Sequence, residues 1–413
     1  MPFEPNKEFL EQLAEAVHLR DVSFILASFE GMHASDISEV LDYMETEECK
    51  YIFGLLNNQI CADILTNLEA GTRKEFLQAF SSAEIALLLD CMDSDDGADI
   101  LNDQPVKLRE EVIALMNNQE TASHIVDLLH YDEDCAGGLM AKELMKANIN
   151  WTVKQCIEEI RRQAERVDKI FTIYVVNDTN TLMGRVSLKE LILASDVKQI
   201  RDLYIPRIES VQTYHKEEEV AELMQKYDLG AVPVINVQGK LMGRITIDDV
   251  LDVITEQAEI DQQMMSGISE NIEEDDNVWM LSRARLPWLL IGTAGGLLGA
   301  QFIGVFEADL RVVPAMAFFI PLITATGGNV GIQSSTIVVQ TLASPSAFAS
   351  TPWQRLSKAL LVALLNGVVI ATVVFSFNVF FSPLGLSLVV SAALMSVVML
   401  ASLMGTLTPI ALN

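Results

Sequence analysis

The charges of this chain are divided so unevenly that one continuous soluble fold is excluded. From Leu286 to Asn413 only five residues are charged, with a net charge of +1, whereas residues 1–285 have a net charge of −30. The nearly uncharged part contains four long apolar segments, 286–306, 312–340, 356–381 and 386–412. Each is long enough for a helix to cross the hydrocarbon of a lipid bilayer. The sequence therefore predicts a polytopic α-helical membrane domain over 286–413, preceded by an acidic soluble part.

The few basic residues near these segments predict their orientation. Arg283 and Arg285 precede the first segment, and Arg355 with Lys358 precede the third. Basic residues next to membrane helices remain on the cytosolic side. The first ten residues are polar and do not form a signal peptide. We therefore expect a multi-pass protein of the cell (inner or plasma) membrane with a cytosolic N-terminus and an external loop at 307–311.

The soluble part is typical of a cytosolic binding module, and we expect no enzyme activity. Its five cysteines are irregularly spaced, which predicts reduced thiols without a zinc site. No nucleophile–base set, P-loop or zinc motif is present in the sequence. The acidic surface would repel nucleic acid and attract cations, so we expect no nucleic-acid partner.

An internal repeat divides the soluble part. Residues 1–135 have apolar residues at helical spacing and predict an all-α superhelix. Leu-Met-Gly-Arg then occurs at Leu182 and again at Leu241, a shift of 59 residues. Each copy predicts a β-hairpin that leads into a helix capped by Ser187 or Thr246. This pattern resembles a pair of α+β CBS domains, which we place at 136–200 and 201–258, with a connecting helix at 259–285.

The second apolar segment is unusually polar. Residues 321–340 read PLITATGGNVGIQSSTIVVQ. Three glycines predict a helix broken near Gly327 and Gly328, with backbone carbonyls turned toward a cavity. Close packing of helices through small residues is one interpretation. The other is a pore wall of neutral oxygens, which suits a hydrated divalent ion. Because the four segments contain no acidic residue, this stretch alone does not choose Mg²⁺ over other cations.

Four stretches, in the right order along nearly the whole chain, resemble MgtE-type magnesium transporters. GNVGIQ at 328–333, with Pro321 ahead of it, is similar to the pore signature of this family, although Ile332 stands where a second Asn is usual. RLPWLLIG at 285–292 resembles its first membrane helix. TIDDVLDVITEQAEID at 246–261 resembles the helix that leads into its plug, and YDEDCAGGLM at 131–140 its junction before the first CBS domain.

The resemblance implies a homodimeric Mg²⁺-selective transporter or channel for magnesium uptake, with a pore along the dimer axis. It also implies that cytosolic Mg²⁺, bound between the N-terminal domain, the CBS domains and the plug helix, holds the pore closed. The implied pore-lining residues are Gly328, Asn329, Gln333 and Thr336. The implied Mg²⁺-sensing residues are Asp63, Asp95, Asp99, Gly137 (through its backbone), Glu218, Asp228, Asp249, Asp252, Glu256, Glu259 and Asp261. Lys216 and Gln257 stand where acids are common in the family.

Two further expectations come from the resemblance. The family has a fifth membrane helix that opens on an acidic motif after a segment like GTLTP at 405–409, and this sequence ends at Asn413, before that motif. CBS pairs also bind adenine nucleotides, so ATP is a candidate second ligand. A membrane-anchored Mg²⁺ or nucleotide sensor that does not transport is the alternative function.

Overall fold

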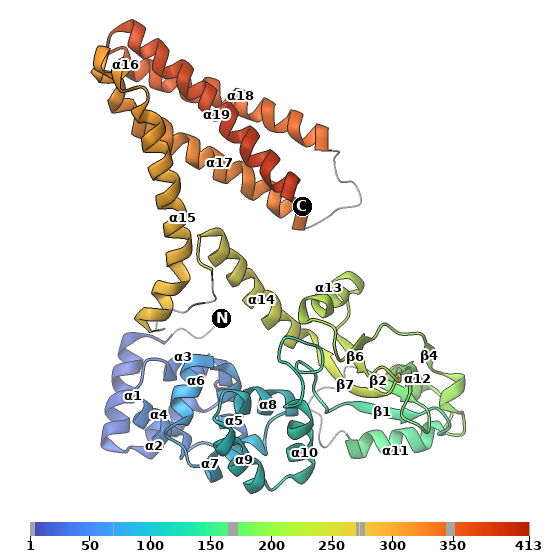
Figure 1. Ribbon diagram of the computed structural model, residues 1–413. Helices are drawn as coiled ribbons and strands as arrows, with labels where there is room; N and C mark the ends of the chain where they lie inside the picture. The colour runs from blue at the N-terminus through green and yellow to red at the C-terminus, as the bar shows by residue number, and fades with distance from the viewer. Residues whose placement is uncertain are drawn as a thin grey trace. The chain divides into compact units, whose positions relative to one another are not determined.

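The computed structural model describes residues 5–68, 70–163, 172–269, 272, 277–343 and 352–412. The chain forms two compact units, Met1–Ala258 and Glu259–Asn413. Figure 1 shows the order of their helices and strands along the chain. Each unit is described by itself below.

The first unit begins with a stack of short helices, the N-terminal helical domain. Side chains cap several of these helices, as when Ser81 and Glu84 form a capping box at the start of α7. The helices are α1 (Lys7–Leu19), α2 (Val22–Phe29), α3 (Ala34–Leu41), α4 (Thr46–Phe53), α5 (Asn58–Asn67), α6 (Ala70–Leu77), α7 (Ser82–Leu89), α8 (Ser94–Asn102), α9 (Val106–Leu115) and α10 (Gln119–Leu128). They confirm the predicted all-α fold.

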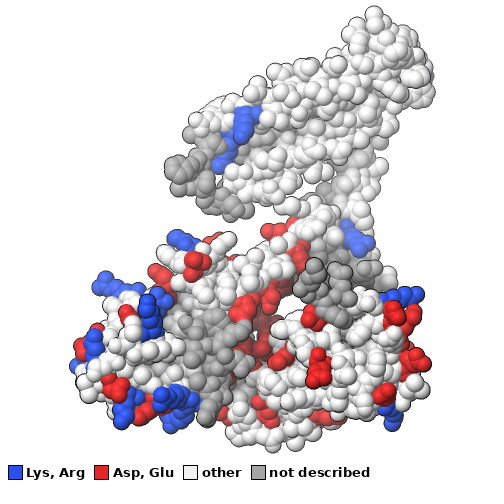
Figure 2. Space-filling model, turned by 180° about the vertical axis from the view of Figure 1, so that it is seen from behind, with Lys and Arg blue, Asp and Glu red and all other residues white. Residues whose placement is uncertain are grey.

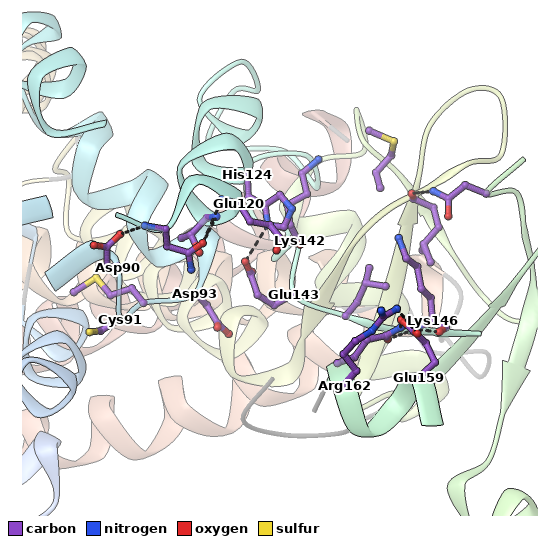
Figure 3. A pocket seen from close by; sticks show the side chains of 18 of the residues that line it. Asp90, Cys91, Asp93, Glu120, His124, Lys142, Glu143, Lys146, Glu159 and Arg162 are labelled. Atoms are coloured by element: carbon purple, nitrogen blue, oxygen red, sulfur yellow. Dashed lines mark hydrogen bonds and ion pairs between the residues drawn. The ribbon is translucent and has the colours of Figure 1, made fainter. Parts of the chain in front are cut away.

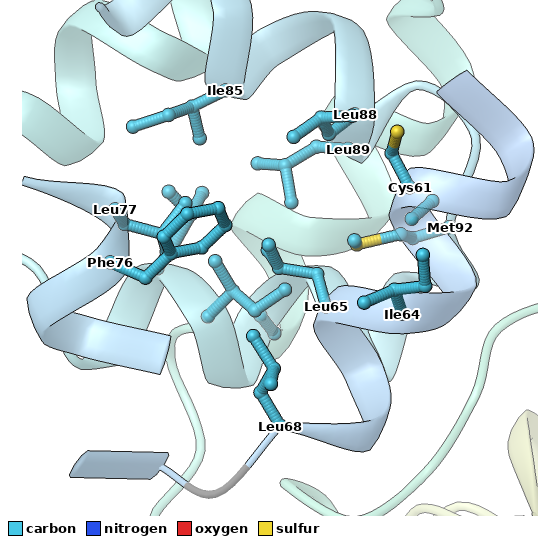
Figure 4. Packing of buried hydrophobic residues seen from close by; sticks show 14 of the residues in the cluster. Cys61, Ile64, Leu65, Leu68, Phe76, Leu77, Ile85, Leu88, Leu89 and Met92 are labelled. Atoms are coloured by element: carbon cyan, nitrogen blue, oxygen red, sulfur yellow. The ribbon is translucent and has the colours of Figure 1, made fainter. Parts of the chain in front are cut away.

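Alternate helices pack against each other and bury one apolar face each. Ile64 and Leu65 of α5 meet Ile85 and Leu89 of α7 in the core that Figure 4 shows, and all four are at most 1% exposed. Three phenylalanine rings, Phe53, Phe76 and Phe80, join this region edge to face, with ring centroids 4.9–5.9 Å apart. Consecutive contacts of this kind produce the stacked helical domain.

Two small sheets follow and correspond to the sequence repeat. The first repeat (136–200, with β4 just after it) contains β1 (Met145–Asn148), α11 (Val153–Gln163), β2 (Ile173–Val176), β3 (Leu182–Val186), α12 (Leu188–Leu193), a 3-10 turn at Ile200–Asp202 and β4 (Ile205–Pro206). The second repeat (201–258) contains β5 (Val211–Gln212), α13 (Glu217–Tyr227), β6 (Ala231–Ile235), β7 (Leu241–Thr246) and the start of α14 (Ile247–Met265). In each sheet a parallel pair precedes an antiparallel hairpin, β2–β3 or β6–β7.

The glycine of each Leu-Met-Gly-Arg motif allows a neighbouring backbone to approach closely. A Cβ on Gly184 would lie 2.1 Å from the carbonyl oxygen of Ile205, and one on Gly243 would lie 2.6 Å from that of Ala141. Ile205 of β4 pairs with Arg185 of β3, and Ala141 forms an isolated antiparallel bridge with Arg244 of β7. The motif therefore requires glycine at this position for the same structural reason in both repeats.

In the part of the second unit that the structure describes, four helices are long and apolar enough to cross a membrane. They are α15 (Val278–Gly304), α17 (Ile320–Ala343), α18 (Pro352–Asn378) and α19 (Leu384–Leu412), with α16 (Glu307–Val312) and a 3-10 turn at Pro314–Phe319 between the first two. Both α17 and α18 pack along α19. The four predicted membrane segments are confirmed. Residues 259–265 of the predicted connecting helix extend α14, and Arg283 and Arg285 belong to α15.

The predicted break at Gly327 and Gly328 is wrong. Helix α17 is continuous from Ile320 to Ala343, and the irregular backbone lies earlier, at residues 313–319. A continuous helix satisfies its own backbone hydrogen bonds, which is the least costly state in hydrocarbon. The carbonyls of this glycine-rich stretch are therefore part of the helix and are not turned toward a cavity.

Candidate metal-sensing site and pore helix

The start of α8 is fixed against residues 142–143, near the beginning of the first repeat. Ser94 is fully buried, and Glu143 accepts hydrogen bonds from its backbone N–H (3.1 Å) and its hydroxyl (2.7 Å). The Ser94 hydroxyl oxygen in turn accepts the backbone N–H of Lys142 at 3.0 Å. His124 of α10 places its Nδ1 3.2 Å from Glu143 Oε1. These contacts, with His124 and Glu143 labelled in Figure 3, join three segments of the first unit.

Glu143 is suited to this role because it is held as a carboxylate. Burial by itself raises its pKa, but the hydrogen bonds from His124 and Ser94 outweigh burial and lower it. Two ion pairs support the same contact. Arg244 Nη2 lies 3.9 Å from Asp93 Oδ2, and Lys142 Nζ lies 3.6 Å from Asp127 Oδ2. The contact thus combines buried hydrogen bonds with paired charges.

Acidic side chains gather beside this contact. Asp95, Asp96 and Asp99 of α8 approach Asp249 of α14, and we call these four residues the acidic cluster. Burial among the surrounding groups and repulsion from Asp96 and Asp249 raise the pKa of Asp95 well above its usual range. Burial and neighbouring acids raise the pKa of Asp96 to about 7. Burial raises that of Asp99 to about 7 as well, although Arg73 lowers it. Ionised, these carboxylates repel one another.

Asp249 is positioned by the helix that carries it. Its Oδ2 accepts the backbone N–H of Thr246 at 2.8 Å and the Thr246 hydroxyl at 2.7 Å. This is the geometry of an N-terminal cap, and it fixes the carboxylate at the start of α14. Burial raises the pKa of Asp249 even though the two bonds from Thr246 lower it.

A second acidic group surrounds the start of α13. Glu217 is affected by Asp134, Glu256 and Glu218, and burial together with these neighbours raises its pKa to about 7. Glu218 and Glu256 belong to the sensing residues that the sequence predicted, whereas Glu217 and Asp134 do not. This group joins the junction after α10, the second repeat and α14 of the first unit.

The remaining predicted sensing residues lie more scattered. Asp63 on α5 accepts a hydrogen bond from Gln59 at 3.2 Å and is exposed. Gly137 is buried against the Tyr131 ring and donates its N–H to the Thr213 carbonyl oxygen at 2.9 Å. Asp228 ends α13 in a left-handed conformation (φ 52°). Asp252, Glu259 and Asp261 are exposed positions on α14, and burial and Asp248 raise the pKa of Asp252.

The acids are near one another but not arranged as a finished binding site. In the described parts of the chain, no three His, Cys, Asp or Glu side chains converge so that they could hold a metal ion. Asp95, Asp99 and Asp249 nevertheless bring carboxylates near one another, and carboxylates are hard oxygen donors of the kind that Mg²⁺ and Ca²⁺ prefer. The full predicted ligand set stays a prediction. Figure 2 shows acidic side chains on the visible face of the first unit, interspersed with basic ones.

Sequence reasoning missed Asp96, Glu143 and Glu217. Asp96 stands three residues after Asp93 and three before Asp99, a spacing that brings side chains to the same side of a helix, so the run itself was a usable signal. Glu143 and Glu217 depend on contacts between segments far apart in the sequence. No local pattern marks either residue.

Helix α17 has two opposite stripes. Gly327, Gly331, Ser334 and Val338 form the packing stripe against α19. A Cβ on Gly405 of α19 would lie 2.5 Å from the Gly331 carbonyl oxygen, and the hydroxyls of Ser334 and Ser402 are 3.2 Å apart. These small residues let the two helices approach closely, as the packing interpretation expected.

The polar stripe consists of Asn329, Gln333, Thr336 and Gln340. At 3.6 residues per turn its spacing places it on the side of α17 opposite the packing stripe. Asn329, Gln333 and Gln340 are exposed in the single chain, and Thr336 is half-buried. Gly328, the fourth predicted pore residue, is exposed beside this stripe. Gln340 was not predicted, although it continues the same spacing.

Long apolar helices with an internal polar stripe, preceded by an acidic domain and a paired α+β repeat, define a class of multi-pass membrane proteins with a regulatory soluble part. Family models match the chain at residues 32–134 (MgtE intracellular N domain), at 136–196 and 200–256 (CBS domain) and at 320–413 (divalent cation transporter). The chain belongs to the MgtE family of magnesium transporters, as its similarity to a curated relative shows.

That relative is the magnesium transporter MgtE of Thermus thermophilus, which is 30% identical over 97% of this chain and 90% of its own length. The magnesium transporter MgtE of Bacillus subtilis is 26% identical over 92% of this chain and 86% of its own length. Among solved structures, the cytosolic domain of the Mg²⁺ channel MgtE in complex with ATP is 30% identical. It covers 59% of this chain and 99% of the solved chain, with a TM-score of 0.56.

The raised pKa values of the acidic cluster predict a pH dependence of stability. In the unfolded chain these carboxyls titrate near 3.8, and in the folded chain Asp96 and Asp99 titrate near 7. Their protonation therefore favours the folded state, and this stabilisation is lost as the pH rises from about 4 through 7. Without divalent ions, we expect the first unfolding midpoint of the full chain to fall over this window by several degrees.

The double variant Asp96→Asn, Asp99→Asn should flatten this pH dependence, whereas Glu8→Gln and Glu11→Gln on the exposed face of α1 should not. Thermal unfolding in detergent with a chelator, followed by circular dichroism from pH 4 to 8, makes the measurement. Equal slopes for the wild type and the double variant would contradict the assignment.

Proposed function

We propose that this chain carries Mg²⁺ across the cell membrane through a pore lined by α17, and that cytosolic Mg²⁺ closes this pore. The observation that carries the proposal is the polar stripe of α17. Asn329 and Gln333 lie on the face opposite the packing stripe, within a helix long and apolar enough to cross a membrane. Amide side chains that face lipid at that depth raise the free energy of the protein. They are therefore expected to contact water, ions or other protein groups.

A wall of neutral amide and hydroxyl oxygens suits Mg²⁺ in particular. Mg²⁺ loses its waters reluctantly, so a site can hold it by hydrogen bonds to the waters that it keeps. Gln333 and Thr336 provide such groups along one line of the helix. The membership in a magnesium-transporter family supports Mg²⁺ as the transported ion.

The same stripe supports a homodimer. In one chain the stripe faces away from α19, and α15 leaves Leu290 and Phe302 exposed as well. A second copy facing the first would enclose the two polar stripes between them and leave apolar side chains to the lipid. The pore then lies on the dimer axis, where closed two-fold symmetry places identical surfaces opposite each other.

The acidic cluster supports gating by cytosolic Mg²⁺. Ionised, Asp95, Asp99 and Asp249 repel one another and disfavour the contact of α8 with α14, so the first unit has an open and a closed arrangement. A bound dication supplies the positive charge that offsets this repulsion. We infer that Asp63, Gly137, Glu218, Asp228, Asp252, Glu256, Glu259 and Asp261 complete such sites, within the chain or across the dimer.

Orientation follows from the basic residues. Arg283 and Arg285 lie near the start of α15, and Lys358 lies near the start of α18. By the positive-inside rule, we expect the N-terminal ends of both helices to face the cytosol. The acidic first unit, which precedes α15, then lies on the cytosolic side, where it can respond to internal Mg²⁺. We place the protein in the cell membrane on this basis and expect no catalytic activity.

Loss of one amide in the polar stripe should block transport. Replacing Asn329 by Leu removes hydrogen bonds to the hydrated ion and puts an apolar group in its path. We expect Mg²⁺ flux into liposomes, followed with an enclosed Mg²⁺-sensitive dye, to fall at least tenfold while the melting temperature stays unchanged. Val369→Leu, at an exposed apolar position of α18, is the control and should keep its flux. Wild-type flux from the Asn329→Leu variant would refute the pore assignment.

Loss of the sensing carboxylates should leave the pore open. In the double variant Asp95→Asn, Asp99→Asn, two of the proposed Mg²⁺ ligands have lost their charge. The repulsion that a bound dication offsets is weaker as well. We expect wild-type flux to fall severalfold as Mg²⁺ rises on the cytosolic face and the flux of the double variant to stay nearly constant. Glu11→Gln on α1 is the control. Normal inhibition of the double variant would show that the gate lies elsewhere, and wild-type silence would favour a sensor that does not transport.

A second ligand, ATP, is supported by a separate observation. A cavity of about 440 Å³ in the first repeat is lined by Arg185, Ser187, Leu188 and Ile205 among others, and so offers a cation, a hydroxyl and apolar walls. The cytosolic domain of a relative has been solved with ATP. We therefore place an adenine nucleotide in this cavity, the first cleft.

Reversal of charge at Arg185 should abolish ATP binding there. Arg185→Glu sets a carboxylate against the phosphates, and we expect the affinity for ATP, measured by titration calorimetry of the full chain, to fall at least tenfold. Arg161→Glu on α11 is the control for the change in net charge. Unaltered affinity in Arg185→Glu would exclude the first cleft as the ATP site.

A further inference from the structure

The position of α17 in its bundle is fixed by a contact with α19 in which backbone meets backbone. The two helices pack along each other (Figure 1). A Cβ on Gly405 of α19 would lie 2.5 Å from the Gly331 carbonyl oxygen and 3.1 Å from the Ser334 Cβ. One turn before Gly405 on α19, the Ser402 hydroxyl lies 3.2 Å from the Ser334 hydroxyl, and Ser402 is 5% exposed. The glycine therefore sets the distance of closest approach between the two helices.

The Gly405 contact differs from the other close contact of α17 in what can yield. A Cβ on Gly327 of α17 would lie 2.8 Å from Cγ1 of Val397, which is the end of a side chain. The Gly331 carbonyl oxygen, by contrast, belongs to the backbone of a continuous helix. A side chain can change its rotamer, but this oxygen moves only if α17 moves with it. The contact at Gly405 is therefore the one that positions α17.

The polar stripe is carried by the same turn of α17. Asn329 and Gln333 lie two residues before and two residues after Gly331, on the side of the helix that faces away from α19. A group that pushed the Gly331 carbonyl away from α19 would move both amides in the direction in which they face. Carbon atoms need about 3.5 Å for an ordinary contact, so a methyl group at residue 405 would displace α17 by about 1 Å.

We propose that Gly405 is a positioning residue that sets the width of the ion path. This inference rests on the proposed pore, in which the polar stripes of two copies face each other. Because glycine has no Cβ, α17 can stand back against α19 and leave room between the stripes. Mg²⁺ loses its waters reluctantly, so its path has to be wide enough for an ion that keeps several of them. A side chain at residue 405 would narrow this path from both sides.

The width of the path also bears on the choice between ions. Ca²⁺ accepts varied numbers and arrangements of oxygen ligands, whereas Mg²⁺ needs a nearly ideal octahedral set and usually keeps waters in it. Narrowing the path therefore raises the barrier more for Mg²⁺ than for Ca²⁺. Gly405, which touches neither ion, would act on selectivity through the position of Asn329 and Gln333.

The test compares Gly405→Ala with Gly385→Ala in liposomes, with Mg²⁺ and Ca²⁺ fluxes followed by enclosed dyes. Gly385 is an exposed residue of the same helix, and a Cβ there would have no atom within 4 Å, so it controls for the exchange of glycine for alanine. We expect the Mg²⁺ flux of Gly405→Ala to fall at least fivefold and its Ca²⁺ flux to fall less. Gly385→Ala should keep the Mg²⁺ flux of the wild type.

A second change, on the opposite face of α17, separates positioning from a loss of stability. Gln333→Asn shortens the amide side chain by one methylene and withdraws it from the path. We expect Gln333→Asn, added to Gly405→Ala, to restore the Mg²⁺ flux to at least half of the wild-type value. Recovery of this kind is non-additive, and damage to the packing of the bundle would not produce it.

The other results overturn the proposal in distinguishable ways. Equal Mg²⁺ flux in Gly405→Ala and Gly385→Ala would refute the role of Gly405 and leave the proposed pore standing. A loss that Gln333→Asn does not reverse would show that Gly405 serves only the stability of the bundle. No flux in the wild type would remove the pore and this inference together.

A milder variant serves if Gly405→Ala fails to fold in detergent. Ser402→Thr adds one methyl group at the same contact and keeps the hydroxyl that meets Ser334. It should lower the Mg²⁺ flux in the same direction, and Gln333→Asn should again reverse the loss. Unchanged Mg²⁺ flux in a folded Ser402→Thr would contradict the inference.

Discussion

Repulsion among carboxylates at the start of α8 is the constraint on which the arrangement of the first unit depends. Buried hydrogen bonds from Ser94 to Glu143 hold α8 in place, and the ion pair of Asp93 with Arg244 supports them. The same contact brings Asp95 and Asp96 toward Asp249, where burial and like charge raise their pKa values. Attraction and repulsion are therefore built into one contact, which makes its free energy sensitive to protons and to cations.

In the membrane helices, close packing determines which face of α17 is buried. Gly327, Gly331 and Ser334 commit one face of α17 to α19, and Gly405 of α19 approaches so closely that a methyl group would not fit. Once that face is committed, helical geometry leaves Asn329 and Gln333 on the opposite side. The packing interpretation thus applies to one face of α17, and the proposed pore wall would occupy the opposite face.

Local sequence patterns were enough to predict most of the fold. The apolar runs, the uneven charge and the Leu-Met-Gly-Arg repeat are properties of short segments, and the membrane helices and both hairpins follow from them. The break predicted at Gly327 failed because glycine is only permissive, and hydrogen bonding within the helix decides in hydrocarbon. Of the predicted sensing residues, Asp95, Asp99 and Asp249 lie near one another in the structure, and their role as ligands stays a prediction. Glu143 and Glu217 were missed because their roles arise from partners distant in sequence.

The difference between the two repeats shows how one motif can serve two purposes. In the second repeat Thr246 donates twice to Asp249, which fixes that carboxylate toward the acidic cluster. In the first repeat the equivalent residues are Ser187 and Glu190, and Ser187 caps α12 without a side-chain hydrogen bond. Arg185, Ser187 and Glu190 are exposed in the first repeat, whereas Arg244 and Thr246 are each 6% exposed in the second. The same motif therefore presents its side chains to an open cleft in one half and positions a carboxylate beside α8 in the other.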